Sequence, residues 1–230
     1  MSSVKLLTAN LFKKGANAQA LANVLGRLKP EILAVQELTA LPAEVIAAEF
    51  AHTSLSPFPD GTGIGLAARR PVTWSPMPMP HRPGIIATLE PNAWAEFGGP
   101  VDVVGVHFIN PIEWSPWTTH RIRRGQVEAI MSYAARTPRR QVICGDLNAT
   151  PAWPAYRQLM RYYRDGVLEA NARKRGRPAS TWAPSRAGPR LLRIDHVLVS
   201  GLSVTTAETV RVDGSDHLAV LADLADDRRS

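Results

Sequence analysis

The sequence has a single cysteine and no long apolar run, and these two absences narrow the class of protein. Cys144 is the only cysteine among 230 residues, so no disulfide can form within the chain, and we expect it to be a core residue rather than a nucleophile. No segment reaches the roughly 18 apolar residues that a membrane-spanning helix needs. The N-terminus also lacks the regions of a signal peptide. We therefore expect a soluble, cytoplasmic protein.

Several catalytic motifs are absent as well. The sequence contains no HExxH, Walker or GxSxG pattern, and it has too few cysteines and no close histidine pair for a zinc site. Ser215 near His217 is the only hint of a nucleophilic serine, and positions so close in sequence rarely place a hydroxyl on an imidazole. Zinc and serine-hydrolase chemistry are therefore disfavoured.

The composition is that of an ordinary globular protein with an excess of positive charge. Hydrophobic residues make up 45% of the chain, enough for a sizeable core, and we expect one domain spanning residues 1–230. The 27 basic residues exceed the 20 acidic ones, which gives a formal charge of +7. This charge favours anionic partners, which include nucleic acid, phosphorylated small molecules and anionic lipid.

Short apolar runs alternate with helical patterns along the chain, and this predicts two packed sheets with helices outside. Five prolines between residues 71 and 83 predict an edge strand or a loop there. We expect the strand over 204–212 to pair antiparallel with the strand over 191–200, and 171–178 to be a basic loop. The predicted strands cover 4–11, 31–37, 63–69, 72–77, 84–89, 101–108, 141–146, 191–200, 204–212 and 218–224, and the predicted helices cover 17–28, 42–50, 121–135 and 153–163.

The stretch Gln141–Asn148 changes character within a few residues. The apolar run over 142–144 suits a buried strand, and Gly145, Asp146, Leu147 and Asn148 follow it. Because side chains alternate along a strand, Asp146 and Asn148 point to the same side and Leu147 points into the core. The pattern predicts a carboxylate and an amide side by side at the mouth of a buried strand, although a simple turn has the same residues.

Polar side chains recur where apolar runs end. Each has an ordinary explanation taken alone; His107, for example, could be a satisfied core histidine. The repetition is harder to dismiss, because carboxylates and histidines are costly at the edge of a core unless they are paired or bind metal. Convergent oxygen ligands suit a hard divalent cation, Mg²⁺ or Mn²⁺. The residues in question are Asn10, Glu37, His107, Asp146, Asn148, Asp195, Asp216 and His217.

The order and spacing of these residues resemble the endonuclease/exonuclease/phosphatase superfamily, which includes pancreatic deoxyribonuclease, abasic-site endonucleases, neutral sphingomyelinases and inositol polyphosphate 5-phosphatases. The matching segments, spread over residues 4–224, are Asn10 after a β run, Val35-Gln-Glu37, Val106-His-Phe108, Gly145-Asp-Leu-Asn148, Ile194-Asp-His196 and Ser215-Asp-His217. The resemblance implies a four-layer α/β sandwich, with two packed mixed β-sheets flanked by helices.

The resemblance also implies metal-dependent cleavage of a phosphate ester, with a role for each residue. Glu37 would be the principal metal ligand, with Asn10 and Asp216 near it. Asp146 would orient or deprotonate the attacking water, and Asn148 would hold a phosphate oxygen. The remaining roles concern histidines: His217 would contact the phosphate, Asp195 would fix the tautomer of His217, and His107 would be a general acid for the leaving oxygen.

The chain departs from the abasic-site endonucleases of this family at two places. The abasic-site endonucleases carry a tyrosine where this chain has His107, and they carry an acidic residue where this chain has Phe12. Asn110 could match a further polar residue of that branch. The long loops that typically grip duplex DNA are also missing, so abasic-site repair is disfavoured.

The substrate should be chosen by the loops around the site. Arg173 and Arg175 could contact phosphates, and Trp182 could line the site and stack on a base, although solvated arginines and packed tryptophans are the commoner case. We expect a monomer with a nucleic-acid substrate. The alternatives are a phospholipid or sugar-phosphate substrate, and a catalytically silent binding module. Salt dependence separates the first two, because only contact with many phosphates gives a steep dependence.

Overall fold

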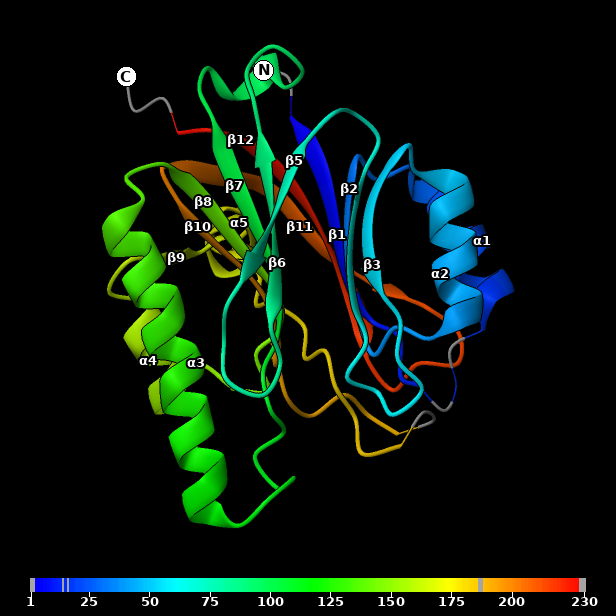
Figure 1. Ribbon diagram of the computed structural model, residues 1–230, viewed down its shortest axis with the longest axis vertical. Helices are drawn as coiled ribbons and strands as arrows, with labels where there is room; N and C mark the ends of the chain where they lie inside the picture. The colour runs from blue at the N-terminus through cyan, green and yellow to red at the C-terminus, as the bar shows by residue number, and fades with distance from the viewer. Residues whose placement is uncertain (1–2, 14, 16, 186–187, 228–230) are drawn as a thin grey trace.

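The computed structural model describes residues 3–13, 15, 17–185 and 188–227, and it arranges them in four layers. Two six-stranded mixed sheets pack face to face, and helices cover their outer faces (Figure 1). This is the four-layer α/β sandwich that the family resemblance implies, so the predicted fold class is confirmed.

The first sheet places the N-terminal strand at its centre. β1 and β2 pair in parallel, so both strands end at the same edge, with Asn10 opposite Gln36. β12 runs antiparallel to β1 and therefore begins at that edge. In spatial order the strands are β11 (Leu202–Arg211), β12 (Leu218–Asp226), β1 (Val4–Asn10), β2 (Ile32–Gln36), β4 (Ile64–Ala68) and β3 (His52–Ser56).

The second sheet repeats this arrangement. Its parallel pair joins β7 to β8, with His107 opposite Asp146, and β10 lies antiparallel to β8, with Asp195 opposite Asp146. In spatial order the strands are β5 (Thr73–Met77), β6 (Gly84–Leu89), β7 (Val101–His107), β8 (Arg140–Asp146), β10 (Asp195–Ser200) and β9 (Arg164–Asp165). β5 is an edge strand, which confirms the prediction for the proline-rich segment.

The main core fills the space between the two sheets. Leu6, Ala34 and Leu66 of the first sheet belong to the same buried cluster as Val103 and Cys144 of the second. Alternating side chains on each strand supply this layer, and the opposite faces pack under the helices. Cys144 is a core residue, as predicted, and burial raises the pKa of its thiol to about 12, which keeps the thiol protonated at neutral pH.

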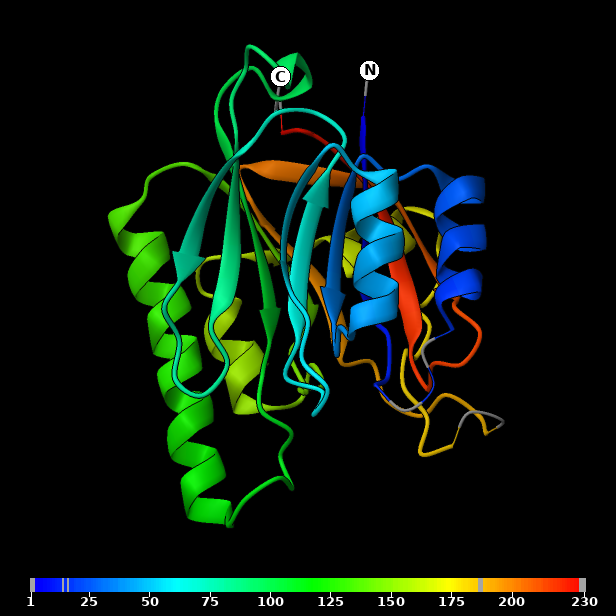
Figure 2. The same ribbon diagram turned by 45° about the vertical axis from the view of Figure 1, so that its right-hand side comes forward.

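The helices form the two outer layers. α1 (Ala18–Leu28) and α2 (Ala40–Glu49) cover the first sheet, and α3 (Pro116–Arg136) and α4 (Pro154–Leu159) cover the second (Figure 2). Asn17 caps α1 by accepting the backbone N–H groups of Gln19 and Ala20. The short helices α5 (Gly166–Arg173) and η1 (Ala95–Phe97) complete the set. Within the described ranges, no helix is long and apolar enough to cross a membrane.

The predicted pairing of the strand over 204–212 with the strand over 191–200 is wrong. β11 pairs with β12 in the first sheet, whereas β10 belongs to the second sheet. Only Gly201 separates β10 from β11, and its φ of +70° lets the chain cross from one sheet to the other within one residue. Val199 and Val204 face the same core from opposite sheets. The apolar residues of these two strands therefore follow the same pattern that a hairpin within one sheet would show, so the sequence does not distinguish the two arrangements.

Candidate active site

The polar residues predicted at strand ends converge on one edge of the sandwich. β1, β2, β7 and β8 end there, and β10 and β12 begin there because they run antiparallel to their neighbours. This edge is the lower one in Figure 1. The topology of two similar sheets thus brings together side chains that lie up to two hundred residues apart in the sequence.

The end of β8 holds Asp146 in a fixed position. Gly145 has a φ of +139°, and a Cβ there would lie 2.0 Å from the carbonyl oxygen of Val106, so only glycine fits against β7. The Asp146 carboxylate accepts the backbone N–H of Asn148 at 2.7 Å, the Asn148 Nδ2 at 3.2 Å and the Asn10 Nδ2 at 3.1 Å. Asp146 and Asn148 therefore meet side by side, as the sequence pattern predicts.

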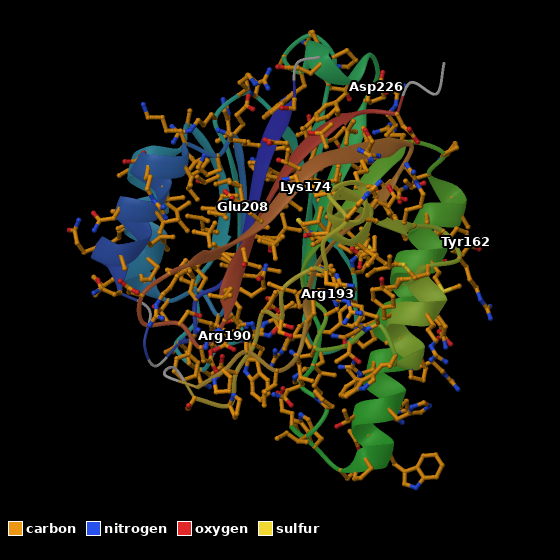
Figure 3. All side chains as sticks on the ribbon, turned by 180° about the vertical axis from the view of Figure 1, so that it is seen from behind. Tyr162, Lys174, Arg190, Arg193, Glu208 and Asp226 are labelled. Carbon is orange, nitrogen blue, oxygen red and sulfur yellow. The ribbon has the colours of Figure 1, made fainter. Side chains whose placement is uncertain are left out.

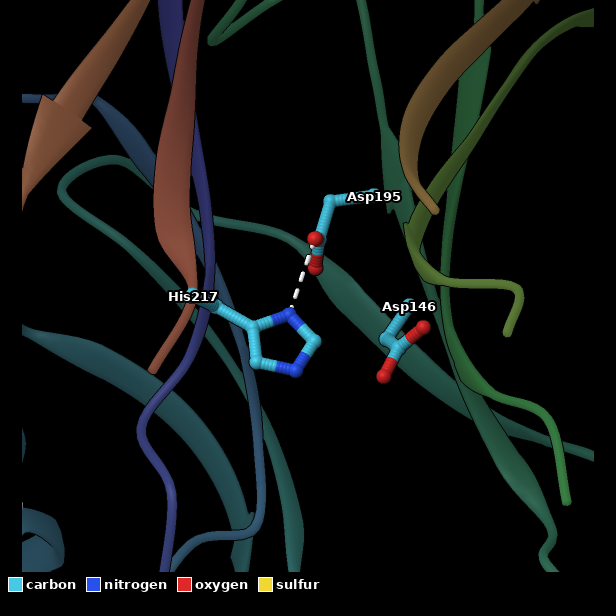
Figure 4. A group of neighbouring side chains, drawn as sticks. All are labelled: Asp146, Asp195 and His217. Atoms are coloured by element: carbon cyan, nitrogen blue, oxygen red, sulfur yellow. Dashed lines mark hydrogen bonds and ion pairs between the residues drawn. The ribbon is translucent and has the colours of Figure 1, made fainter. Parts of the chain in front are cut away.

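His217 and Asp195 form a buried pair across the two sheets (Figure 4). The His217 Nδ1 lies 2.9 Å from the Asp195 Oδ2, and it carries the proton because a carboxylate can only accept. Burial disfavours the imidazolium, but the charge and hydrogen bond of Asp195, together with Asp146 and Asp216, raise the pKa of His217 to about 9. His217 is therefore protonated at neutral pH.

Asp146 and Asp195 are two buried carboxylates in one small site. Burial, followed by the charge of Asp195, raises the pKa of Asp146 to about 7, although His217 and the hydrogen bonds from Asn148 and Asn10 oppose the rise. A carboxylate with this pKa can take up a proton at neutral pH, which suits a general base.

The site also contains carboxylate oxygens without a hydrogen-bond partner. Among the described residues, the Asp216 Oδ1 and the Asp195 Oδ1 are buried and accept no hydrogen bond. The Asp216 Oδ2 accepts the Trp182 Nε1 at 3.3 Å, and the Asp216 Oδ1 lies 4.0 Å from the His217 Nε2. Unpaired buried oxygens are costly, and a hard cation would satisfy them. Polar atoms of Asp146, Asp195 and His217 also lie within 4.8 Å of one another, but a protonated His217 cannot itself bind a cation.

Glu37 follows β2 with a φ of +54° and faces the same edge. Its Oε1 accepts the Asn10 Nδ2 at 3.2 Å, and its Oε2 accepts the backbone N–H of Lys13 at 3.1 Å. The Asn10 Oδ1 accepts the backbone N–H of Phe12. Asn10 thus turns its amide nitrogen toward Glu37 and Asp146 and bridges the two carboxylates.

His107 is held by an arginine that the sequence reasoning missed. The Arg82 Nη1 lies 2.8 Å from the His107 Nε2, and the Arg82 Nη2 donates to the Glu113 Oε2 at 2.7 Å. Burial and the charge of Arg82 lower the pKa of His107 well below its usual value, so the imidazole is neutral at neutral pH. The only signal for Arg82 was its place near the end of the proline-rich segment, two residues before the strand β6 begins.

These residues surround a cleft of about 650 Å³, a size typical of a small-molecule or cofactor site. Asn10 and Asp195 lie behind its wall and support the residues that line it. Lys13, Asp60 and Thr62 also line the cleft and carried no recognisable sequence signal. The predicted residues that line the cleft are Glu37, His107, Asn110, Asp146, Asn148, Trp182, Asp216 and His217.

Arg173 and Arg175 are not brought to this cleft. Arg173 lies at the end of α5, and its Nη1 donates to the carbonyl oxygen of Val204 in β11 at 3.2 Å. Lys174, the residue between them, is seen from behind beside β11 (Figure 3). The predicted loop over 171–178 is in fact helical up to Arg173. A contact of these arginines with a substrate in the cleft therefore has no support in the structure.

A two-sheet sandwich with carboxylates, histidines and amides gathered at its strand ends is the architecture of phosphoester hydrolases of one superfamily. The model of the Endonuclease/Exonuclease/phosphatase family matches residues 7–217, and the chain belongs to this family. None of the curated proteins compared with the chain matches it significantly.

Solved structures agree on the fold. The 3′ phosphatase NExo from Neisseria, bound to a product DNA hairpin, is 19% identical with a TM-score of 0.74, covering 95% of this chain and 98% of its own. D. rerio TDP2 complexed with a single-strand DNA product is 15% identical with a TM-score of 0.73, covering 97% and 99%. The human Nocturnin catalytic domain with a bound sulfate anion is 16% identical with a TM-score of 0.73, covering 97% and 93%.

Proposed function

We propose that the protein is a divalent-cation-dependent phosphodiesterase whose reacting groups are Asp146 and His217. The observation that carries this proposal is the buried group of Asp146, Asp195 and His217 beside the cleft, in which a carboxylate with a pKa of about 7 faces a protonated imidazole. Phosphoester hydrolysis needs a base for the attacking water and a positively charged donor for the phosphate, and Asp146 and the His217 imidazolium can supply them.

The cation is Mg²⁺ or Mn²⁺, because the donors are carboxylate oxygens and not thiolates. Glu37 and Asp216 would hold it, which is supported by the unpaired Oδ1 of Asp216. When bound, it neutralises phosphate charge and polarises the phosphorus–oxygen bond.

Each of the remaining groups has a task that follows from its position. Asp146 takes a proton from the attacking water. The Asn148 amide nitrogen donates to the Phe108 carbonyl oxygen and to Asp146, so it must release one of these bonds to hold a phosphate oxygen. His217 lines the cleft, and its Nε2–H donates to the phosphate and gives its proton to the leaving oxygen as the phosphorus–oxygen bond breaks, while Asp195 holds the opposite nitrogen. This Asp–His arrangement fixes the tautomer and stabilises the imidazolium, as in other hydrolases.

The general-acid role expected for His107 is revised in this proposal. A general acid must carry a proton, and the pKa of His107 is well below its usual value because of burial and Arg82. We assign His107 the task of positioning Arg82, whose guanidinium lines the cleft and adds positive charge where the phosphate would lie.

Nucleic acid is the first candidate substrate, supported by the charge of +7 and by Trp182 in the cleft wall. Two of the similar structures contain DNA products. Phospholipid is the second candidate, and one observation favours it: Ile112, at the rim of the cleft, is 87% exposed. Salt dependence and the choice of substrate separate the two.

The test is hydrolysis of bis(p-nitrophenyl) phosphate and of a labelled DNA strand, each with Mg²⁺, with Mn²⁺ and with EDTA. We expect cleavage that requires the cation and falls by about 10²- to 10⁴-fold or more in His217→Ala and in Glu37→Gln. Glu208→Gln, an exposed glutamate on β11, is the matched control and should retain full activity.

Each result has a definite meaning. Cleavage of both substrates supports a nuclease, whereas cleavage of the small ester alone keeps the chemistry and favours lipid or sugar phosphates. Full activity of Glu37→Gln would remove Glu37 from the site. No cation-stimulated cleavage of either ester, or of a phospholipid, would support a catalytically silent binding module.

A further inference from the structure

Three large apolar side chains are exposed within six residues of one another, and the first of them, Ile112, lines the cleft. Ile112 is 87% exposed, Trp114 is 54% exposed and Trp117 is 84% exposed. We call these three residues the rim patch. Together they expose on the order of a few hundred Å² of apolar surface, which is as large as the functional patches of many soluble proteins.

The rim patch lies on a loop that hydrogen bonds and ion pairs support. The Ile112 N–H donates to the Asn110 Oδ1 at 3.0 Å, and Ser115 caps α3 directly after the loop. The Glu113 carboxylate contacts Arg82 at 2.7 Å and His81 at 3.1 Å, so the arginine offsets its charge next to the patch. The apolar side chains are therefore carried by a hydrogen-bonded loop.

The patch also projects. The N-terminal end of α3 and the loop before it extend beyond the edges of both sheets (Figures 1 and 2). A groove that holds nucleic-acid bases has walls, and isoleucine has no π face on which a base could stack. A projecting group of isoleucine and tryptophan instead matches side chains that enter the interface of a bilayer, where tryptophan is enriched.

The neighbouring charge favours an anionic surface. The sequence from residue 114 to 127 contains no Asp or Glu, and His120, Arg121 and Arg124 of α3 are exposed next to Trp117. Among the described residues, Arg124 forms one ion pair, with Glu128 at 3.2 Å, and both side chains are exposed to solvent, so the pair is weak. Basic residues beside an apolar insertion attract anionic lipids.

We propose that the rim patch docks the protein on the surface of an anionic phospholipid bilayer, with Arg121 and Arg124 facing the lipid phosphates. Because Ile112 also lines the cleft, the docked protein presents the mouth of the cleft to the lipid surface. This inference goes beyond the proposed function, since binding to a bilayer needs none of the catalytic groups.

The experiment is flotation of the full chain with vesicles of phosphatidylcholine, with and without phosphatidylglycerol. We expect binding that requires phosphatidylglycerol and falls about tenfold or more in Trp117→Ser, because burial of one large apolar side chain stabilises binding by about that factor.

Arg121→Gln/Arg124→Gln should also weaken binding. Leu41→Ser, which changes a residue that is 66% exposed on α2, is the control and should bind like the wild type. Brominated lipid should quench the tryptophan fluorescence of the wild type more than that of Trp117→Ser.

Other occupants of the patch would give other results. No binding to either vesicle, or equal binding by Trp117→Ser, would overturn the proposal. A dimer that Trp117→Ser dissociates would assign the patch to a second copy of the chain. Loss of binding to a single-stranded oligonucleotide in Trp117→Ser, without binding to vesicles, would assign it to nucleic acid. The hydrolysis proposal is tested separately, because His217→Ala should bind vesicles normally and Trp117→Ser should hydrolyse the soluble ester normally.

Discussion

Two buried clusters of ionisable side chains begin at neighbouring residues of β10 and differ in how well they are satisfied. Asp195 belongs to the site cluster, Asp146, Asp195 and His217. The next residue, His196, points to the other face of the sheet and belongs to the structural cluster, Tyr156, Asp165, Arg193 and His196. Both clusters contain buried carboxylates, so burial alone does not distinguish a functional group from a structural one.

The difference lies in the partners. Asp165 accepts Tyr156 at 2.7 Å, Arg193 at 2.7 Å and the backbone N–H of Leu168 at 2.9 Å. Burial alone would raise the pKa of Asp165, but His196, Arg193 and Tyr156 lower it far below its usual value. The site cluster instead places two carboxylates together and leaves oxygens unpaired. Unsatisfied charge of this kind is typical of a site that awaits a ligand.

The largest effect that would test this comparison is expected from Asp195→Asn. The amide can still accept the His217 Nδ1–H, but it removes the negative charge that raises the pKa of His217. We expect the rate of cation-dependent hydrolysis to fall by about 10²- to 10⁴-fold, with the free energy of unfolding unchanged or higher. The measurement is kcat and KM with the pH–rate profile, whose basic limb should move to lower pH.

The control for Asp195→Asn is Asp102→Asn. Asp102 is equally buried, on β7, and accepts Thr88 at 2.7 Å and Tyr133 at 2.8 Å, outside the cleft. This variant should lose stability and keep its pH–rate profile. An Asp195→Asn enzyme with the wild-type rate and profile would show that Asp195 does not act through His217.

Asp165→Asn is expected to lose stability and keep activity, the reverse of Asp195→Asn. Asparagine keeps the cap on α5 but leaves Arg193 buried without its counter-charge, so we expect the free energy of unfolding to fall by about 3–5 kcal/mol. Because the folded-state pKa of Asp165 is lowered, its contribution is present above about pH 4 and is lost as the pH falls further. Urea unfolding at neutral and acidic pH measures both effects. Unchanged stability at neutral pH would contradict the structural role, and activity per folded molecule should stay close to wild type.

The strand ends are what the sequence could predict well. Apolar runs that end in a polar residue are local patterns, and Asn10, Glu37, His107, Asp146 and His217 follow from them. What the sequence could not give is the partner of each side chain. Arg82 reaches His107 only because β6 and β7 are neighbours, and nothing in the sequence around residue 82 encodes that contact.

The two sheets could be predicted from the family resemblance, but the crossing between them could not. Gly201 redirects the chain within one residue, and both flanking strands bury valines in the same core. The helix α5 was missed because its eight residues are too few to show a helical period, and its stability comes from packing Val167 and Ala170 into the main core. Arg173 was predicted to contact substrate because of its charge, but charge indicates only that a side chain is exposed and not where on the surface it lies.

The last prediction concerns the pH dependence of the free energy of unfolding, measured with EDTA. Asp146 has a folded-state pKa of about 7, above its usual value of 3.8, because of burial and Asp195. The folded protein therefore binds a proton that the unfolded chain releases between about pH 4 and pH 7, and stability should fall as the pH rises through this range. Asp146→Asn should remove this fall, whereas Asp213→Asn, at a carboxylate that is 77% exposed, should keep it. Parallel curves for the wild type and Asp146→Asn would mean that the two carboxylates of the site do not repel each other, and the contrast with Asp165 would then rest on hydrogen bonding alone.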